Sequence, residues 1–113
     1  YLRREQIPYL LAGADHVDLE TALTKIRTEI GATCVVSQAG GGLNGALLRA
    51  GLVDELHLIT IPALVGGAGT PSVIDGIPLE RGSLPTPLST INVQVGAHGS
   101  IWVHYEVAEI SRN

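Results

Sequence analysis

The sequence predicts an α/β fold in which a strand–helix–strand–helix–strand unit is followed by an antiparallel hairpin. Apolar residues recur at helical spacing over residues 19–30, and short β-favouring runs lie on both sides of that stretch. A third such run follows a second, shorter helical stretch. Two further runs near the C-terminus are joined by a glycine-bounded turn. Because helices connect the first three strands, we expect these strands to be parallel.

The first part of the chain carries the stronger helix signal. Residues 8–12 form a short apolar run that predicts a first strand. Asp18 then provides a side-chain oxygen for the free amides of a first helical turn, and Gly31 provides a C-terminal stop. Residues 33–37 favour β-structure without polar alternation, which is typical of a strand covered on both faces. The helix between these strands has one apolar stripe, formed by Leu19, Ala22, Leu23, Ile26 and Ile30.

The rest of the chain predicts one more helix, one more strand, a long loop and the hairpin. Residues 43–50 predict a short helix, and residues 56–61 predict a third strand that ends before a proline. Residues 66–89 are rich in proline and glycine and have no sustained period, so we expect a long loop there. Residues 91–95 and 100–107 then predict two strands of an antiparallel hairpin.

Composition excludes several classes of protein. The 113 residues are 45% hydrophobic and 16% charged, which is typical of one folded domain. The formal net charge is -4 and the sequence has no basic run, so we expect no nucleic-acid binding. No apolar run is long enough for a transmembrane helix, and the N-terminus lacks a signal-peptide pattern. We therefore expect no membrane partner and a cytoplasmic location.

Cysteine and histidine content argues against a disulfide framework and against a metal site. Cys34 is the one cysteine of the sequence, and it lies in an apolar run where we expect it to pack in the core. The histidines have no pairwise spacing typical of metal ligands, so we expect no metal. They are His16, His57, His98 and His104.

The most informative segment is the glycine-rich stretch between the second expected strand and the second expected helix. Gly40, Gly41 and Gly42 are consecutive, and Gly45 follows. The first amides of a helix have no intrahelical acceptor and attract anions, while glycines let a phosphate approach the backbone. The dinucleotide fingerprint also requires an acidic residue about 20 positions further on, which is missing here, and a Walker A motif requires Lys where Ala46 stands. We therefore expect phosphate binding on another fold, with a ligand-free turn as the alternative.

A second glycine-rich loop, residues 66–69, follows the third expected strand. Ligands of open α/β sheets bind at the carboxyl ends of the strands. The two glycine loops are therefore expected to share a cleft, the alternative being a flexible exit into the long loop.

A longer motif resembles a known family. Residues 44–56 read N-G-A-L-L-R-A-G-L-V-D-E-L, and residues 62–67 read P-A-L-V-G-G. This pattern closely resembles the pyrimidine reductase domain of riboflavin biosynthesis, which has a dihydrofolate reductase-like fold. The resemblance runs from about residue 8 to the C-terminus and covers the second half of such a domain. Residues 1–113 are thus expected to form the C-terminal part of one reductase domain.

The resemblance implies a hydride transfer from NADPH that reduces the ribosyl group of a ribosylamino-pyrimidinone 5′-phosphate to ribityl. The family usually has Glu-Gly-Gly before its Leu-Asn, with the Glu touching substrate and the glycines holding the cofactor. Here Gln38 stands at the Glu position and Ala39 at the first Gly, so the resemblance implies that Gln38 binds substrate. The residues it implies for the cofactor are Gly40, Gly41, Gly42, Leu43, Asn44 and Gly45.

Two other functions remain open from the sequence. A neutral amide at Gln38 donates as well as accepts hydrogen bonds, which leaves a pterin-like substrate as an alternative. The second alternative is a non-catalytic nucleotide-binding or dimerisation module of the same fold. The resemblance implies a homodimer formed through the hairpin around residues 101–107. We expect this segment on its own to be inactive, because the family's opening strands have no counterpart in it.

Overall fold

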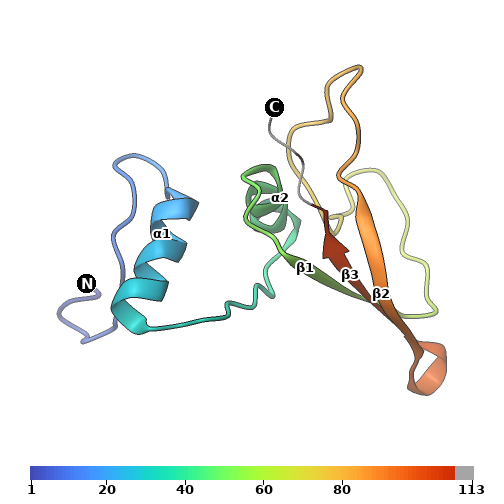
Figure 1. The fold of residues 1–113 in the computed structure, drawn as a ribbon, viewed down its shortest axis with the longest axis horizontal. Helices are drawn as coiled ribbons and strands as arrows, with labels where there is room; N and C mark the ends of the chain where they lie inside the picture. The colour runs from blue at the N-terminus through green and yellow to red at the C-terminus, as the bar shows by residue number, and fades with distance from the viewer. Residues whose placement is uncertain (109–113) are drawn as a thin grey trace. The chain divides into compact units, whose positions relative to one another are not determined.

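The computed structural model describes residues 1–108, which divide into two units, Tyr1–Gln38 and Ala39–Asn113, the second described through Ala108. The first unit contains α1 (Leu19–Lys25) and the π-helical turn η1 (Ile26–Ile30). The second contains α2 (Gly41–Arg49), β1 (Glu55–Thr60), β2 (Leu88–Val95), the 3-10 turn η2 (Ala97–Gly99) and β3 (Ile101–Val107) (Figure 1). Within residues 1–108, no helix has both the length and the apolar character needed to cross a bilayer.

The helix expected over residues 19–30 is confirmed in the first unit, with its last turn in the π form. The backbone amide of Thr21 donates to Asp18 Oδ1 at 2.9 Å, as an N-cap requires. Hydrogen bonds from Thr21, chiefly from its amide, hold the pKa of the Asp18 carboxyl below its usual 3.8. Gly31 ends the helix in the left-handed conformation, at φ 77°.

The second unit is built on a three-stranded sheet of order β1-β3-β2, in which both pairs are antiparallel. β2 and β3 form the expected hairpin, joined through η2, and β1 corresponds to the third expected strand. In Figure 1, β3 lies between the other two strands, and the long loop runs from the end of β1 to the start of β2. Within the part of the chain that the structure describes, neither β1 nor β2 has a second neighbour in this sheet, so both are edge strands there.

The expected parallel unit is wrong for the described residues. Residues 8–12 and 33–37 do not form strands, and β1 pairs with β3 in the antiparallel direction. An apolar, β-favouring run indicates a preference for extended backbone, but a strand also needs a partner with which to exchange hydrogen bonds. Cys34 lies in the second of these segments and is exposed, so the expectation that it packs in a core is also wrong.

Side chains alternate between the two faces of the sheet. Leu56, Leu58, Val103 and Tyr105 share one face and are half-buried. The opposite face is mainly polar, as the alternation along the last strand predicts. From β1 and β3 it carries Glu55, His57, Ile59, Trp102, His104 and Glu106. No hydrophobic side chain is fully buried anywhere in residues 1–108. The apolar face of the sheet is therefore only partly covered.

Candidate functional site

The glycine-rich segment forms the N-terminus of α2, as the sequence predicts. The helix begins at Gly41, two residues earlier than expected, so most of the segment is helical. Its N-cap is Gly40, with φ -74° and ψ 173°, and no side chain caps it. Since the first amides of a helix have no intrahelical acceptors, this N-terminus presents partial positive charge without a capping oxygen from its own N-cap.

The glycines of α2 fall into two groups with different surroundings. Gly41 and Gly45 are one turn apart on the same side of the helix, and both are buried. A Cβ on Gly41 would collide with the backbone oxygen of Ser72, and one on Gly45 with that of Asp75. These two glycines therefore allow residues 72–76 of the long loop to pack directly against the helix.

Hydrogen bonds hold the loop in this position. The amide of Asp75 donates to Gly41 O at 3.0 Å, and Arg49 Nη1 donates to Asp75 O at 3.1 Å. Asn44 Nδ2 donates to Ala39 O at 3.1 Å and to Val73 O at 3.3 Å. Asn44 therefore links both the segment that precedes α2 and the long loop to one position on the helix.

The other side of the helix N-terminus is open. A Cβ on Gly40 or on Gly42 would meet nothing within 4 Å, and both residues are exposed. On the loop side, Asp75 Oδ2 lies 2.6 Å from the place of a Gly41 Cβ, so that side already carries a carboxylate. An anion that binds the first amides of α2 would therefore approach from the side of Gly40 and Gly42.

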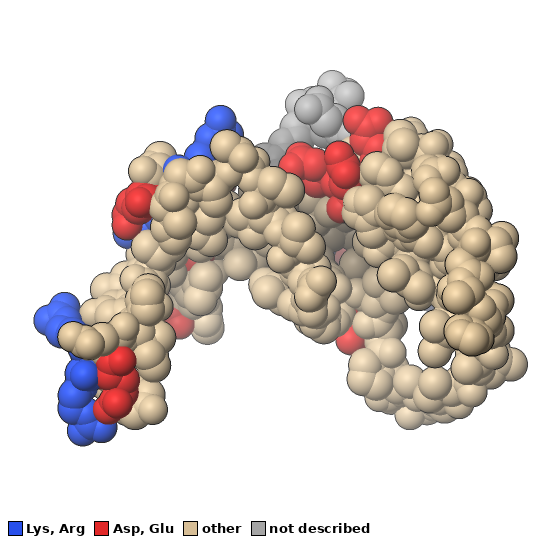
Figure 2. Space-filling view, turned by 90° about the horizontal axis from the view of Figure 1, so that it is seen from below, with Lys and Arg blue, Asp and Glu red and all other residues tan. Residues whose placement is uncertain are grey.

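The second unit offers few cations to assist such an anion. Over residues 39–108 its basic side chains are Arg49 and Arg81, and Arg49 is at the far end of α2, bonded to the loop. On the face drawn in Figure 2, acidic side chains are visible on this unit and basic ones are not. Within this unit, backbone amides are thus the main source of positive potential at the glycine segment.

The remaining site residues expected from sequence are exposed. Gln38 is the last residue of the first unit, two positions before the α2 N-cap. In the second glycine loop, a Cβ on Gly66 or Gly69 would meet nothing within 4 Å, and Thr70 Oγ1 donates to Gly66 O at 2.6 Å. The part of the long loop that packs on α2 is residues 72–76, and the shared cleft of the two glycine loops stays a prediction.

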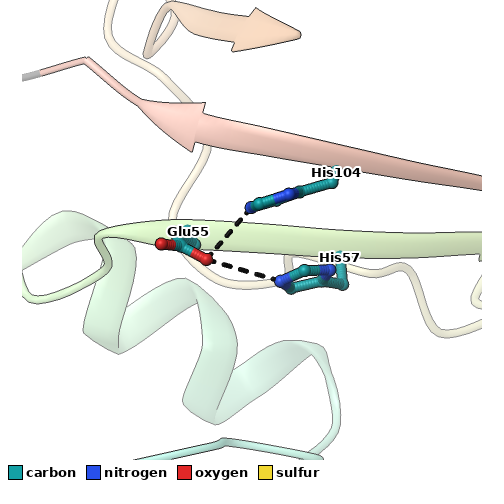
Figure 3. Close-up of side chains that lie close together, drawn as sticks. All are labelled: Glu55, His57 and His104. Atoms are coloured by element: carbon teal, nitrogen blue, oxygen red, sulfur yellow. Dashed lines mark hydrogen bonds and ion pairs between the residues drawn. The ribbon is translucent and has the colours of Figure 1, made fainter. Parts of the chain in front are cut away.

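The sheet brings together three side chains whose proximity could not be inferred from their spacing in the sequence. Glu55 and His57 are two positions apart on β1, and His104 is directly opposite His57 on β3. Glu55 Oε2 lies 3.0 Å from His104 Nε2 and 3.5 Å from His57 Nε2 (Figure 3). The only sequence signal for this cluster is the alternation that places Glu55 and His57 on one face, because the third member depends on the pairing of β1 with β3.

Comparison with known proteins identifies the family. The profile of the RibD C-terminal domain matches residues 2–100. The chain belongs to the RibD C-terminal domain family. Among curated relatives, it is 32% identical over 73 residues to a 2,5-diamino-6-ribosylamino-4(3H)-pyrimidinone 5′-phosphate reductase of Methanothermobacter thermautotrophicus, a match covering 65% of this chain and 33% of that protein. It is 36% identical over 62 residues to the riboflavin biosynthesis protein RibD of Bacillus amyloliquefaciens, covering 55% of this chain and 16% of that protein.

Solved structures of similar proteins show the same fold. A pyrimidine reductase-like protein of Corynebacterium diphtheriae matches 96% of the chain with a TM-score of 0.78 and 19% identity. RibD of Acinetobacter baumannii matches 85% of it with a TM-score of 0.71 and 20% identity. The RibD-type, dihydrofolate reductase-like fold expected from the sequence is thereby confirmed. The chain spans about a third of the length of the Methanothermobacter reductase and 42% of the Corynebacterium protein.

Proposed function

We propose that this chain is the cofactor-binding, C-terminal part of an NADPH-dependent reductase domain that acts on a ribosylamino-pyrimidinone 5′-phosphate. The observation that carries the proposal is the N-terminus of α2, which is rich in glycine, uncapped by a side chain and open on the side of Gly40 and Gly42. The names of the two curated relatives support the reaction and the substrate class. We also propose that turnover requires parts of the domain outside this chain, since the match spans about a third of the Methanothermobacter reductase.

In this proposal the residues of α2 bind and orient the cofactor, and NADPH supplies the hydride. A phosphate group of the cofactor accepts hydrogen bonds from the first amides of α2, reached past Gly40 and Gly42. Leu43 is exposed at the same end and contacts the cofactor. Asn44 and Gly45 act by holding residues 72–76 and the helix entry, and Gly41 does so as well while its amide is one of those that face the phosphate. Fixing the phosphate positions the nicotinamide relative to the substrate, which lowers the entropic part of the barrier to hydride transfer.

Replacing Gly42 with valine tests the cofactor site. The added side chain enters the open space through which the phosphate approaches, and the helix has room for it. We expect the dissociation constant for NADPH to rise at least tenfold, about 1.4 kcal/mol, in a titration followed by NADPH fluorescence.

The matched control is Ala50→Val, which adds a branched side chain at the exposed C-terminal end of the same helix. This variant is expected to bind NADPH like the parent chain. Unchanged NADPH affinity in a folded Gly42→Val variant, or an equal loss in both variants, contradicts the proposed site.

We propose that Gln38 contacts the substrate rather than the cofactor, because it stands at the family's substrate-contacting Glu position. Gln38→Glu replaces an amide that donates and accepts with a carboxylate that only accepts. We expect this change to alter the affinity for the pyrimidine phosphate and to leave NADPH affinity within about twofold, or about 0.4 kcal/mol. Binding of each ligand is measured separately by calorimetry, and equal effects on both ligands would assign Gln38 to the cofactor or to the fold.

A further inference from the structure

The polar face of the sheet carries a compact set of ligand-type side chains outside the glycine site. Glu55 and His57 project from the edge strand β1 and His104 from the central strand β3 (Figure 3). The imidazole rings of His57 and His104 are stacked, with centroids 4.1 Å apart and planes 16° apart. All three side chains stand on paired strands, so the backbone fixes their spacing.

The separations between the candidate ligand atoms are close to those of a metal site. One carboxylate oxygen and one nitrogen from each histidine lie within 4.8 Å of one another. In a tetrahedral zinc site with bonds of about 2.0–2.1 Å, ligand atoms are about 3.3 Å apart. The carboxylate-to-histidine separations of 3.0 Å and 3.5 Å already match this value, and only the two nitrogens need to approach each other.

The chemistry of the set selects the kind of ion. Two imidazoles and one carboxylate suit zinc, nickel or copper ions, whereas magnesium and calcium prefer sites made of oxygen ligands alone. The side chains of Glu55, His57 and His104 are 59%, 48% and 22% exposed, so an ion can enter from solvent and keep water in its remaining position. We propose that Glu55, His57 and His104 form a binding site for a divalent transition metal ion, with Zn²⁺ as the ion that fits best.

A neighbouring tryptophan is coupled to this site. Trp102 Nε1 donates to His57 Nδ1 at 3.2 Å, and an indole nitrogen can only donate. His57 Nδ1 is therefore an acceptor, and the proton of the neutral ring is on Nε2, the atom that faces Glu55. When Nε2 binds the metal, its proton passes to solvent and Nδ1 takes up a proton from solvent, so the ring stays neutral with its proton on Nδ1. Two donors would then face each other, so metal binding breaks the hydrogen bond between Trp102 and His57.

This coupling provides a direct optical readout. Trp102 is the one tryptophan of the chain, and its indole lies 5.7 Å from the His57 ring between centroids. Losing the hydrogen bond changes the surroundings of the indole even when the ion itself does not quench fluorescence. Titration of ZnCl₂ into the 113-residue chain is therefore expected to shift tryptophan emission and to saturate at one ion per chain.

Variants separate this site from general zinc binding. Glu55→Gln and His104→Gln each remove one of three ligands, and each is expected to weaken Zn²⁺ binding at least tenfold by calorimetry. His16→Gln, an exposed histidine of the first unit, is the matched control and is expected to leave the affinity unchanged. Because Glu55 is exposed and Gln has the same shape, Glu55→Gln keeps the test valid should His104→Gln fail to fold.

The Trp102→Phe variant tests the coupling itself. It keeps an aromatic ring beside His57 and removes the competing donor, so Zn²⁺ is expected to bind severalfold more tightly, as measured by calorimetry. Parental zinc affinity in folded Glu55→Gln and His104→Gln variants, or an equal loss in His16→Gln, overturns the proposed site. Weaker zinc binding in Trp102→Phe would overturn the proposed proton arrangement on His57.

Discussion

Replacing Gly45 with valine is expected to release residues 72–76 from α2 and to expose them to protease. The new Cβ would collide with the backbone oxygen of Asp75, which lies directly against the helix at this position. Backbone atoms cannot yield as a flexible side chain can, so the loop must move away. Overpacking of this kind costs about 1–3 kcal/mol. The measurement is the rate of thermolysin cleavage before Val73 and Ile74 under native conditions, which we expect to rise at least tenfold.

The control for this experiment lies three residues earlier on the same helix. Gly42→Val adds the same side chain where nothing is within 4 Å, so the loop should stay in place and the cleavage rate should match that of the parent chain. The pair also separates the two roles of the glycine segment, because Gly42→Val is expected to impair NADPH binding without releasing the loop. Equal cleavage rates in the two valine variants would show that the loop does not depend on a glycine at position 45.

The second large effect expected is self-association of the isolated chain. In sedimentation velocity at micromolar concentration, we expect dimers or larger species rather than a monomer of 11.8 kDa. The outer edge of β2 has no partner strand among residues 1–108, all eight residues of β2 are exposed, and none of them is charged. Natural edge strands usually carry charges or proline that prevent pairing with another chain. The half-buried apolar face of the sheet adds to the tendency to associate.

A lysine in the middle of this edge strand should reduce the association. Val93 is at the centre of β2 and 55% exposed, so Val93→Lys places a charge on the edge with little loss of packing. Val17→Lys is the matched control, since Val17 is 68% exposed and precedes α1 in the other unit. A parent chain that sediments as a monomer would contradict the prediction, as would an equal reduction by both lysine variants.

The elements predicted correctly from sequence are those whose signals are local. Asp18 and Gly31 enclose the first helix because a cap and a left-handed stop act within one turn. The hairpin of β2 and β3 follows from two β-favouring runs and the short turn between them. The prediction of strands at residues 8–12 and 33–37 was wrong because their pattern indicates extended backbone and contains no information about a partner strand.

For the candidate cofactor site, only its position in the sequence could be predicted. The glycine run and the start of a helix could be recognised, and the structure places them at the N-terminus of α2. The sequence could not show that Gly41 faces the long loop while Gly42 faces open space, because this difference depends on Ser72 and Asp75, some thirty positions further on. The grouping of His57 with His104 was hidden for the same reason, since it arises from the register of β1 against β3.

The order of the strands also determines when the sheet can form during synthesis. β3 is central, and it is translated after both β1 and β2, which pair with β3 and not with each other. Until residues 101–107 have been made, β1 and then β2 are without their partner, and the β-favouring segment of each remains exposed to chaperones and to other nascent chains once it has left the ribosome. Closing the pair of β1 with β3 also requires a long-range contact, which slows folding. Release of β3 from the exit tunnel therefore sets the earliest moment at which the second unit can assemble.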